Sequence, residues 1–192
     1  SAKAFWQHTG LGLSSREAAI ALGIEKKPST STGHCARNVL VNRLANIYNC
    51  DPSLIQLHRS GMAALTTTLL AIKCIKGNSS ILQIGFPYVD VLKLPQIVFQ
   101  GSDLIVKTNL SHIKEELDKK KPAALIIEIP SNPLLQCVDL ISISKLAQSK
   151  NIPIIVDDTI GSSINVHLTP YADVIFSSLT KSFAGRGDIL AG

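Results

Sequence analysis

Residues 152–159 read IPIIVDDT, and residues 173–181 read DVIFSSLTK. Each stretch is a short apolar run, rich in isoleucine, valine or both, that leads into side chains carrying carboxylates, hydroxyls or an amine. Runs that are apolar almost throughout are typical of parallel strands buried on both faces. Ligands of open α/β sheets bind outside the carboxyl ends of the strands, so we expect Asp157, Thr159 and Lys181 to face one site.

The remaining sequence after residue 80 alternates strand-like and helix-like segments. Apolar runs predict strands at residues 80–84, 103–106, 123–127, 152–156 and 173–176. Periodic apolar residues predict helices at 37–48, 61–75, 110–119 and 140–149. This order predicts the α/β class, as a three-layer sandwich with a mainly parallel sheet. Residues 23–33, which contain KKPSTST, are expected to form an exposed loop.

The composition of the 192 residues is that of a globular protein, with 45% hydrophobic and 17% charged residues. The net charge is +5, but the basic residues are scattered, so we expect no nucleic-acid partner. No segment resembles a signal peptide or a membrane span, and we expect a cytoplasmic protein without a membrane partner. The cysteines have no metal-site spacing; we predict no metal and four unpaired, buried thiols at Cys35, Cys50, Cys74 and Cys137.

Lys181 and Asp157 are the types of residue that a pyridoxal-phosphate site requires. The cofactor is held as an imine, so its lysine must reach the neutral state, which burial or a neighbouring cation promotes by lowering the pKa. A carboxylate beside the pyridine nitrogen keeps the ring protonated and electron-withdrawing. Taken alone, a lysine after a strand is usually a surface residue, and such an aspartate caps a helix as often as it binds a ligand.

The phosphate of that cofactor needs backbone N–H donors and hydroxyls, which a helix N-terminus supplies best. Ser60, Gly61 and Met62 stand where a helix is expected to begin, and Ser178 and Thr180 precede the lysine. The ordinary alternative for Ser60 is a helix cap, and the alternative for Ser178 and Thr180 is a hydroxyl at a strand end. Their order and spacing together favour a single site.

From about residue 35 to residue 192 the sequence resembles the Cys/Met-metabolism family of pyridoxal-phosphate enzymes, which includes cystathionine γ-synthase, the cystathionine lyases and the homocysteine synthases. The resemblance lies in ordered segments: SGMAA at 60–64, PSNPLL at 130–135, VDDT at 156–159, SLTK at 178–181, and DILAG at 188–192. Residues 85–90, GFPYVD, further resemble the fungal type of cystathionine γ-synthase. The resemblance implies the large cofactor domain of the aspartate-aminotransferase-like architecture, called fold type I.

The resemblance also implies roles for the residues named above. Lys181 binds the cofactor covalently and moves protons as acid and base. Asp157 pairs with the pyridine nitrogen, and Thr159 supports the ring or that carboxylate. The phosphate-binding group comprises the backbone and hydroxyl donors of Ser60, Gly61, Met62, Ser178 and Thr180.

Two further residues complete the implied site. Asn132 binds the hydroxyl oxygen of the cofactor ring. Tyr88 is the candidate for the aromatic side chain that stacks on the ring, and Phe86 and Ile84 are the alternatives for that position.

The sequence departs from the family at several places. Ser29–Thr30–Ser31 stands where the family has a Tyr-x-Arg pair that reaches the phosphate of the neighbouring subunit. Ser177 replaces a usual histidine. Asp158 replaces a common asparagine, and it either changes the charge near the ring or points away from it.

The family continues past the position of Gly192 into a C-terminal domain that supplies an arginine for the substrate carboxylate. We therefore expect residues 1–34 to form an N-terminal arm and loop, and residues 35–192 to form the cofactor-binding domain, truncated before the C-terminal domain.

The resemblance implies a γ-replacement on an activated homoserine ester with cysteine, in transsulfuration, with pyridoxal 5'-phosphate as cofactor. A cystathionine or methionine lyase and a homocysteine synthase are alternatives within the family. A non-catalytic fragment, or a cofactor-binding interaction subunit, is an alternative of another class. A nucleotide binder of the Rossmann type is disfavoured because the glycine fingerprint is missing. Relatives imply small amino-acid substrates and a homo-oligomer, either a dimer or a tetramer.

Overall fold

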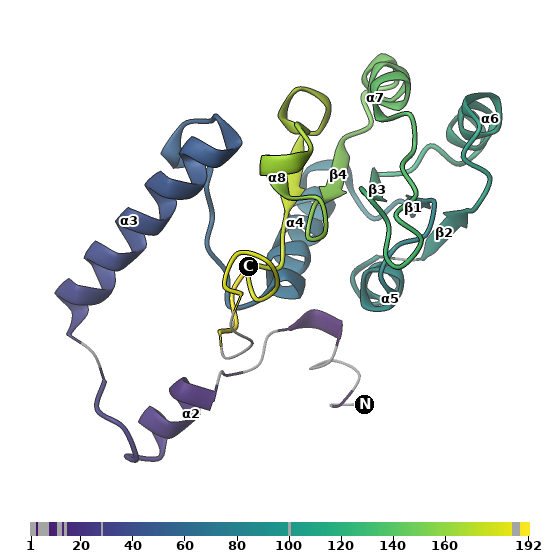
Figure 1. Cartoon of the computed structure of the whole chain (residues 1–192). Helices are drawn as coiled ribbons and strands as arrows, with labels where there is room; N and C mark the ends of the chain where they lie inside the picture. The colour runs from purple at the N-terminus through teal and green to yellow at the C-terminus, as the bar shows by residue number, and fades with distance from the viewer. Residues whose placement is uncertain are drawn as a thin grey trace.

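The computed structural model describes residues 3, 8–10, 13, 15–27, 29–99, 101–185 and 189–192. This part of the chain is an α/β protein built on a five-stranded sheet (Figure 1). The sheet has the strand order β2-β1-β3-β4-β5, and every neighbouring pair is parallel. The strands are β1 (Ile81–Ile84), β2 (Ser102–Ile105), β3 (Ala124–Glu128), β4 (Ile154–Asp157) and β5 (Val174–Phe176).

Helices precede, connect and flank these strands. Parallel strands require crossover connections, and each of the four between β1 and β5 contains an α-helix. The α-helices are α2 (Ser15–Ala21), α3 (Thr30–Tyr48), α4 (Gly61–Lys76), α5 (Val89–Val98), α6 (Leu110–Lys120), α7 (Leu140–Ser149) and α8 (Ser162–Asn165). Two short 3₁₀ turns are η1 (Pro52–Leu54) and η2 (Thr169–Tyr171).

The alternation of side chains along the strands produces two separate cores. In β1, Leu82 and Ile84 pack into a cluster that contains residues of α6 and α7. The intervening Ile81 joins a second cluster, which contains residues of α4 and α5. Strands β3 and β4 follow the same alternation. Figure 1 shows α6 and α7 on one side of the sheet and α4 and α5 on the other, so the predicted three-layer sandwich is confirmed.

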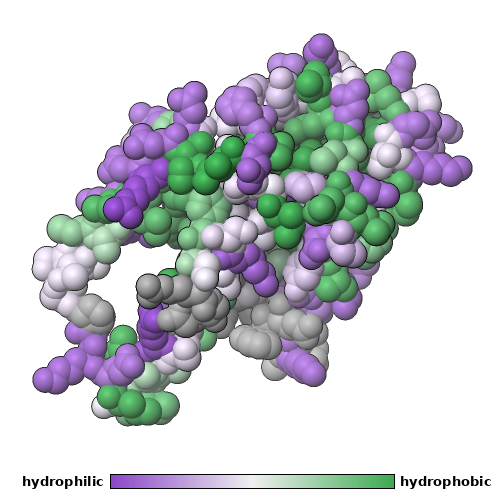
Figure 2. Space-filling view, viewed as in Figure 1, coloured by the Kyte–Doolittle hydropathy of each residue, from purple (hydrophilic) through white to green (hydrophobic). Residues whose placement is uncertain are grey.

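Helix α3 lies apart from these layers (Figure 1). The prediction that residues 23–33 form a loop is wrong at its C-terminal end, because α3 begins at Thr30. Ser29 caps this helix, since its side chain accepts a hydrogen bond of 3.2 Å from the Thr32 backbone N–H. Within α3, Leu44 and Ala45 are the buried residues. Figure 2 shows hydrophobic residues that reach the surface between α3 and the layers of the sheet.

An apolar cavity of about 540 Å³ lies beside β5. Its lining includes Val174 and Ile175 of β5, Ile72 of α4 and Leu57 of the segment that leads into α4. His58 and Gly192 also line the cavity, and their backbones exchange hydrogen bonds of 2.8 and 3.0 Å. Asp157 is not among the residues that line this cavity.

The four cysteines are free thiols, as predicted, but the prediction that they are buried is wrong. Three of them are exposed and Cys50 is half-buried. Cys35 and Cys74 lie on solvent-facing positions of α3 and α4, and Cys137 lies in the connection before α7. In the described part of the chain, no helix combines the length and the apolar character needed to cross a lipid bilayer.

Candidate functional site

Asp157 is the last residue of β4 and lies at the carboxyl edge of the sheet. The residue is 5% exposed. Its Oδ1 atom accepts a hydrogen bond of 3.0 Å from the Thr159 backbone N–H. Burial raises the pKa of the Asp157 carboxyl to about 6, the hydrogen bonds from Thr159 oppose this rise, and the charge of Asp158 adds to it. A buried carboxyl of this kind is suited to pair with a cationic N–H group, such as a protonated pyridine.

The segments that follow β4 and β5 are joined at this edge. The strands pair in parallel, with Asp157 opposite Phe176. The Asp158 backbone N–H donates to the Phe176 carbonyl at 3.1 Å. The Ser178 backbone N–H then donates to Thr159 Oγ1 at 2.9 Å. Thr159 therefore connects the two segments that the sequence predicts at one site.

The N-terminus of α4 also meets Ser178. A Cβ atom on Gly61 would lie 2.9 Å from the Cα and Cβ atoms of Ser178, so this contact requires glycine. Ser60 begins the helix, because its Oγ accepts a hydrogen bond of 3.0 Å from the Ala63 backbone N–H. Helix N-termini attract anions through their unpaired N–H groups and their dipole. Three predicted phosphate-binding residues, Ser60, Gly61 and Ser178, thus lie together.

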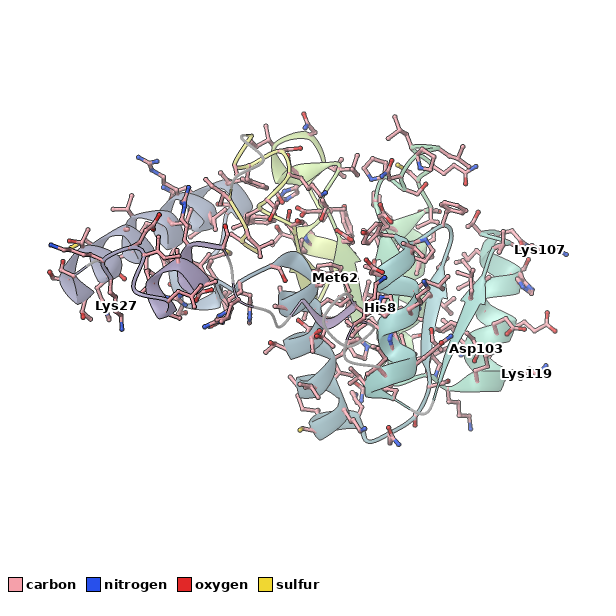
Figure 3. The ribbon with its side chains drawn as sticks, turned by 90° about the horizontal axis from the view of Figure 1, so that it is seen from below. His8, Lys27, Met62, Asp103, Lys107 and Lys119 are labelled. Carbon is pink, nitrogen blue, oxygen red and sulfur yellow. The ribbon has the colours of Figure 1, made fainter. Side chains whose placement is uncertain are left out.

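Residues 8–10 of the N-terminal arm pack on the first turns of α4, which the sequence does not predict. Ser60 Oγ donates to the Gly10 carbonyl at 3.2 Å, and a Cβ on Gly10 would lie 2.9 Å from Met62 Cβ. Figure 3 shows His8 and Met62 in this region. His8 Nδ1 lies 2.8 Å from Asp90 Oδ1 at the start of α5.

The turn after β5 carries Thr180 and Lys181. Thr180 Oγ1 lies 3.3 Å from the Ala191 carbonyl and 3.1 Å from the Ala191 N–H, which ties the turn to residues 189–192. The Lys181 N–H donates to the Ser178 carbonyl at 3.1 Å. Lys181 is exposed among the described residues. Burial is one way to lower the pKa of a lysine amine toward the neutral state, and this structure does not provide it.

Glu128, the last residue of β3, links the segments that carry Tyr88 and Asn132. Glu128 Oε2 accepts a hydrogen bond of 2.7 Å from the Tyr88 backbone N–H. The Asn132 backbone N–H lies near enough to lower the pKa of this carboxyl. Burial, and then the charge of Asp157, raise the pKa of Glu128 to about 7. Sequence reasoning missed Glu128, although ALIIE at 124–128 ends in an acid just as IIVD at 154–157 does.

Tyr88, the candidate for the stacking aromatic, immediately precedes α5 and is 46% exposed. Partial burial, and then its interactions with Asp90, raise the pKa of its hydroxyl. Phe86, one of the alternatives, is 50% exposed, whereas Ile84 is buried in β1. Both aromatic side chains therefore remain accessible to a ligand.

Asp158 faces α3 rather than the edge occupied by Asp157. Its Oδ2 accepts a hydrogen bond of 2.8 Å from the Tyr48 hydroxyl. Burial raises the pKa of the Asp158 carboxyl. Burial and then the charge of Asp158 raise the pKa of the Tyr48 hydroxyl. The hydroxyls of Ser163 and Ser177 lie near enough to lower the pKa of Asp158, but Asp158 Oδ1 has no hydrogen-bond partner among the described residues. This places Asp158 in the packing between α3 and the sheet.

Comparisons with known proteins agree with this geometry. The profile of the family described as Cys/Met metabolism PLP-dependent enzymes matches residues 29–192. A cystathionine gamma-synthase of Neurospora crassa is 31% identical over 172 residues, which cover 86% of this chain and 27% of that protein. An L-2-amino-4-chloropent-4-enoate dechlorinase/desaturase of Streptantibioticus cattleyicolor is 30% identical over 201 residues, covering 97% of this chain and 40% of that enzyme.

The fold has a solved counterpart in a putative O-acetylhomoserine (thiol)-lyase of Campylobacter jejuni, whose structure contains a pyridoxyl-lysine-phosphate. The TM-score is 0.65 at 23% identity, and the match covers 81% of this chain and 38% of that one. This likeness confirms the fold type I architecture. The chain thus spans less than half the length of each of these relatives. From the profile match and these relatives, the chain belongs to the Cys/Met metabolism family of pyridoxal-phosphate-dependent enzymes.

Proposed function

We propose that this chain holds pyridoxal 5'-phosphate covalently through Lys181 and forms the cofactor-binding part of a cystathionine γ-synthase-like enzyme. The observation that carries the proposal is the connection at the sheet edge. The buried carboxyl of Asp157 is linked through Thr159 to Ser178, three residues before Lys181 and beside the N-terminus of α4.

The described residues suit the two ends of this cofactor. Asp157 would accept a hydrogen bond from the pyridine nitrogen, and a cationic donor there favours the ionised form of its carboxyl. The first turn of α4 and the Ser178 hydroxyl would bind the phosphate. Asn132 would bind the ring hydroxyl, and Tyr88 would pack on the ring face. When bound, the cofactor withdraws electrons from the substrate carbons, which makes their protons removable.

The reaction that we propose is a γ-replacement on an activated homoserine ester, with cysteine as the incoming thiol. The Lys181 amine, once free of the cofactor, would take the proton from the α-carbon and move a second proton at the β-carbon. Loss of the γ-leaving group and addition of the thiol complete the replacement. The cystathionine gamma-synthase of Neurospora crassa supports this choice.

A lyase or a homocysteine synthase is the second candidate within the family. The specific support for the lyase is the Streptantibioticus relative, whose name describes a dechlorinase and desaturase rather than a synthase. A chain that binds the cofactor without turnover is the candidate of another class. We further propose that the protein acts in the cytoplasm and forms a homo-oligomer. Sedimentation of the purified chain tests the oligomer, and fractionation of cells tests the location.

The experiment is a titration of the chain with pyridoxal phosphate, followed by addition of an O-acylhomoserine with and without cysteine. We expect a visible absorption band that changes with the ester, and formation of cystathionine when cysteine is present. Lys181→Ala is the control and should give no such band. Release of a keto acid without cysteine would favour the lyase, an unresponsive band would favour the non-catalytic chain, and no binding by the unsubstituted chain would refute the proposal.

A further inference from the structure

Glu128 lies at the carboxyl edge of the sheet, in register with Asp157 on the neighbouring strand. Glu128 is 6% exposed and Asp157 is 5% exposed. Two buried carboxyls on adjacent parallel strands are costly to ionise together, so one of them retains its proton to higher pH. Such a pair, at the edge where ligands of α/β folds bind, requires an explanation beyond packing.

The contacts of Glu128 supply that explanation. Its Oε2 accepts from the backbone N–H of Tyr88, which immediately precedes α5, at 2.7 Å. The backbone N–H of Asn132, in the segment that follows β3, lies near enough to lower the pKa of the same carboxyl. These two segments come from different strands and carry the predicted ring-stacking and ring-hydroxyl residues. A single carboxylate therefore connects both of them to the edge that presents Asp157.

We infer that Glu128 is a positioning residue, which holds the Tyr88 and Asn132 segments in place beside the sheet edge that presents Asp157. This inference rests on the proposed function, because the positions of the Tyr88 and Asn132 segments matter for activity only if these residues bind the cofactor. Glu128 acts through the backbone and need not touch the cofactor. Hydrogen bonds to an ionised acceptor are stronger than those to a neutral one, so the hold tightens when Glu128 loses its proton.

The charge of Asp157 acts on Glu128. Burial raises the pKa of Asp157 to about 6, and burial followed by the charge of Asp157 raises the pKa of Glu128 to about 7. We therefore expect Asp157 to ionise before Glu128 as the pH rises. Asp157 is the ionisable side chain that acts on Glu128 within the described part of the chain. The hydroxyl of Tyr88 interacts instead with Asp90, which pairs with His8.

The test is a pH titration of backbone amide resonances by NMR, on the chain without added cofactor. The Tyr88 and Asn132 amides report Glu128, and the Thr159 amide reports Asp157 through its 3.0 Å hydrogen bond. We expect Tyr88 and Asn132 to share one midpoint that lies above the midpoint of Thr159. Glu128→Gln should abolish the shared titration, and Asp157→Asn should lower its midpoint.

The matched control is Glu25→Gln, the same change at an exposed residue, which should leave all three titrations unchanged. Separate midpoints for Tyr88 and Asn132, or persistence of their titration in Glu128→Gln, would overturn the inference. If Glu128→Gln does not fold, the shift caused by Asp157→Asn still decides the result. These readouts need no bound cofactor, so they separate failure of this inference from failure of the proposed function.

In the cofactor-loaded chain, Glu128→Gln should weaken pyridoxal-phosphate binding by about tenfold, the loss expected for one charge-assisted hydrogen bond. The adduct on Lys181 should still form at saturating cofactor, because Glu128 is not among the residues proposed to bind the cofactor. Unchanged affinity in Glu128→Gln, with a normal adduct, would refute the positioning role while leaving the proposed function intact.

Discussion

The Oγ1 atom of Thr159 accepts a hydrogen bond of 2.9 Å from the backbone N–H of Ser178. This bond joins the segment after β4 to the segment after β5, and Thr159 simultaneously donates its own N–H to Asp157. The carboxyl proposed to meet the pyridine nitrogen and the serine proposed to meet the phosphate are thus both bonded to one residue, through its backbone N–H and its hydroxyl respectively. The proposed site depends on this connection.

Thr159→Val removes the acceptor for Ser178 and leaves a part-buried N–H unpaired. We expect a loss of about 1–3 kcal/mol in the free energy of unfolding, measured by urea denaturation. Thr159→Ser keeps the hydroxyl and is the matched control, with a smaller loss. Equal stability of the two variants would contradict the importance of the bond.

Gly61→Ala should separate the N-terminus of α4 from Ser178, because the added Cβ would lie 2.9 Å from two of its carbon atoms. Overpacking of this kind costs about 1–3 kcal/mol in the free energy of unfolding. Affinity for pyridoxal phosphate, measured by absorbance titration, should fall as well.

Gly33→Ala provides the control for this change. Gly33 lies in α3, and a Cβ atom added to it would have no neighbour within 4 Å, so alanine should be neutral or slightly stabilising there. A Gly61→Ala variant that matches Gly33→Ala in stability and affinity would refute the close contact between α4 and Ser178.

Asp157 should make the stability of the cofactor-free chain depend on pH. Folding raises the pKa of this carboxyl from 3.8 to about 6, so the folded state binds more protons than the unfolded state between those values. Its contribution is therefore most favourable at low pH and declines as the pH rises through about 6, by up to about 3 kcal/mol.

Asp157→Asn removes this ionisation. Above pH 6 the variant should be the more stable protein in urea denaturation, and the difference from the unsubstituted chain should shrink as the pH falls toward 3.8. The same variant should bind pyridoxal phosphate more weakly. A difference in stability that is independent of pH would contradict the buried placement of this carboxyl.

Tyr48→Phe tests the contact between α3 and the sheet. The change leaves the buried Oδ2 of Asp158 without its donor, and we expect a loss of about 1–3 kcal/mol in the free energy of unfolding at neutral pH. Tyr171→Phe is a suitable control, because Tyr171 is half-buried and the change again removes only a hydroxyl. An equal loss in both variants would show that the hydrogen bond between Tyr48 and Asp158 makes no specific contribution to the free energy of unfolding.

The layers of this fold follow from the sequence more readily than its helix boundaries do. Apolar runs such as IIV at 154–156 have few alternatives to a buried parallel strand, and the five expected strands are all present within two residues of the expected ends. Helix α5 escapes sequence-based prediction because Pro95 lies inside it and its residues are apolar on more than one face. Helix α3 starts earlier than expected because one cap at Ser29 outweighs the weak helix propensity of the residues that follow.

The residues of the candidate site also differ in whether the sequence predicts them. Asp157 is identifiable because it ends a buried strand, and Ser178 because it stands two residues after the apolar strand β5. Glu128 ends a strand too, but its partners are backbone N–H groups at residues 88 and 132, and no side-chain pattern encodes those contacts. The direction of Asp158 toward Tyr48 depends on where α3 packs, over a separation of 110 residues, and the local sequence does not encode that packing.

The most direct test of the central claim is peptide mapping by mass spectrometry after the chain is incubated with pyridoxal phosphate and reduced with borohydride. We predict one stoichiometric adduct on Lys181 in the unsubstituted chain and its absence in Lys181→Ala. A stoichiometric adduct on another lysine, or none at all under saturating cofactor, would contradict the claim that the turn after β5 carries the cofactor.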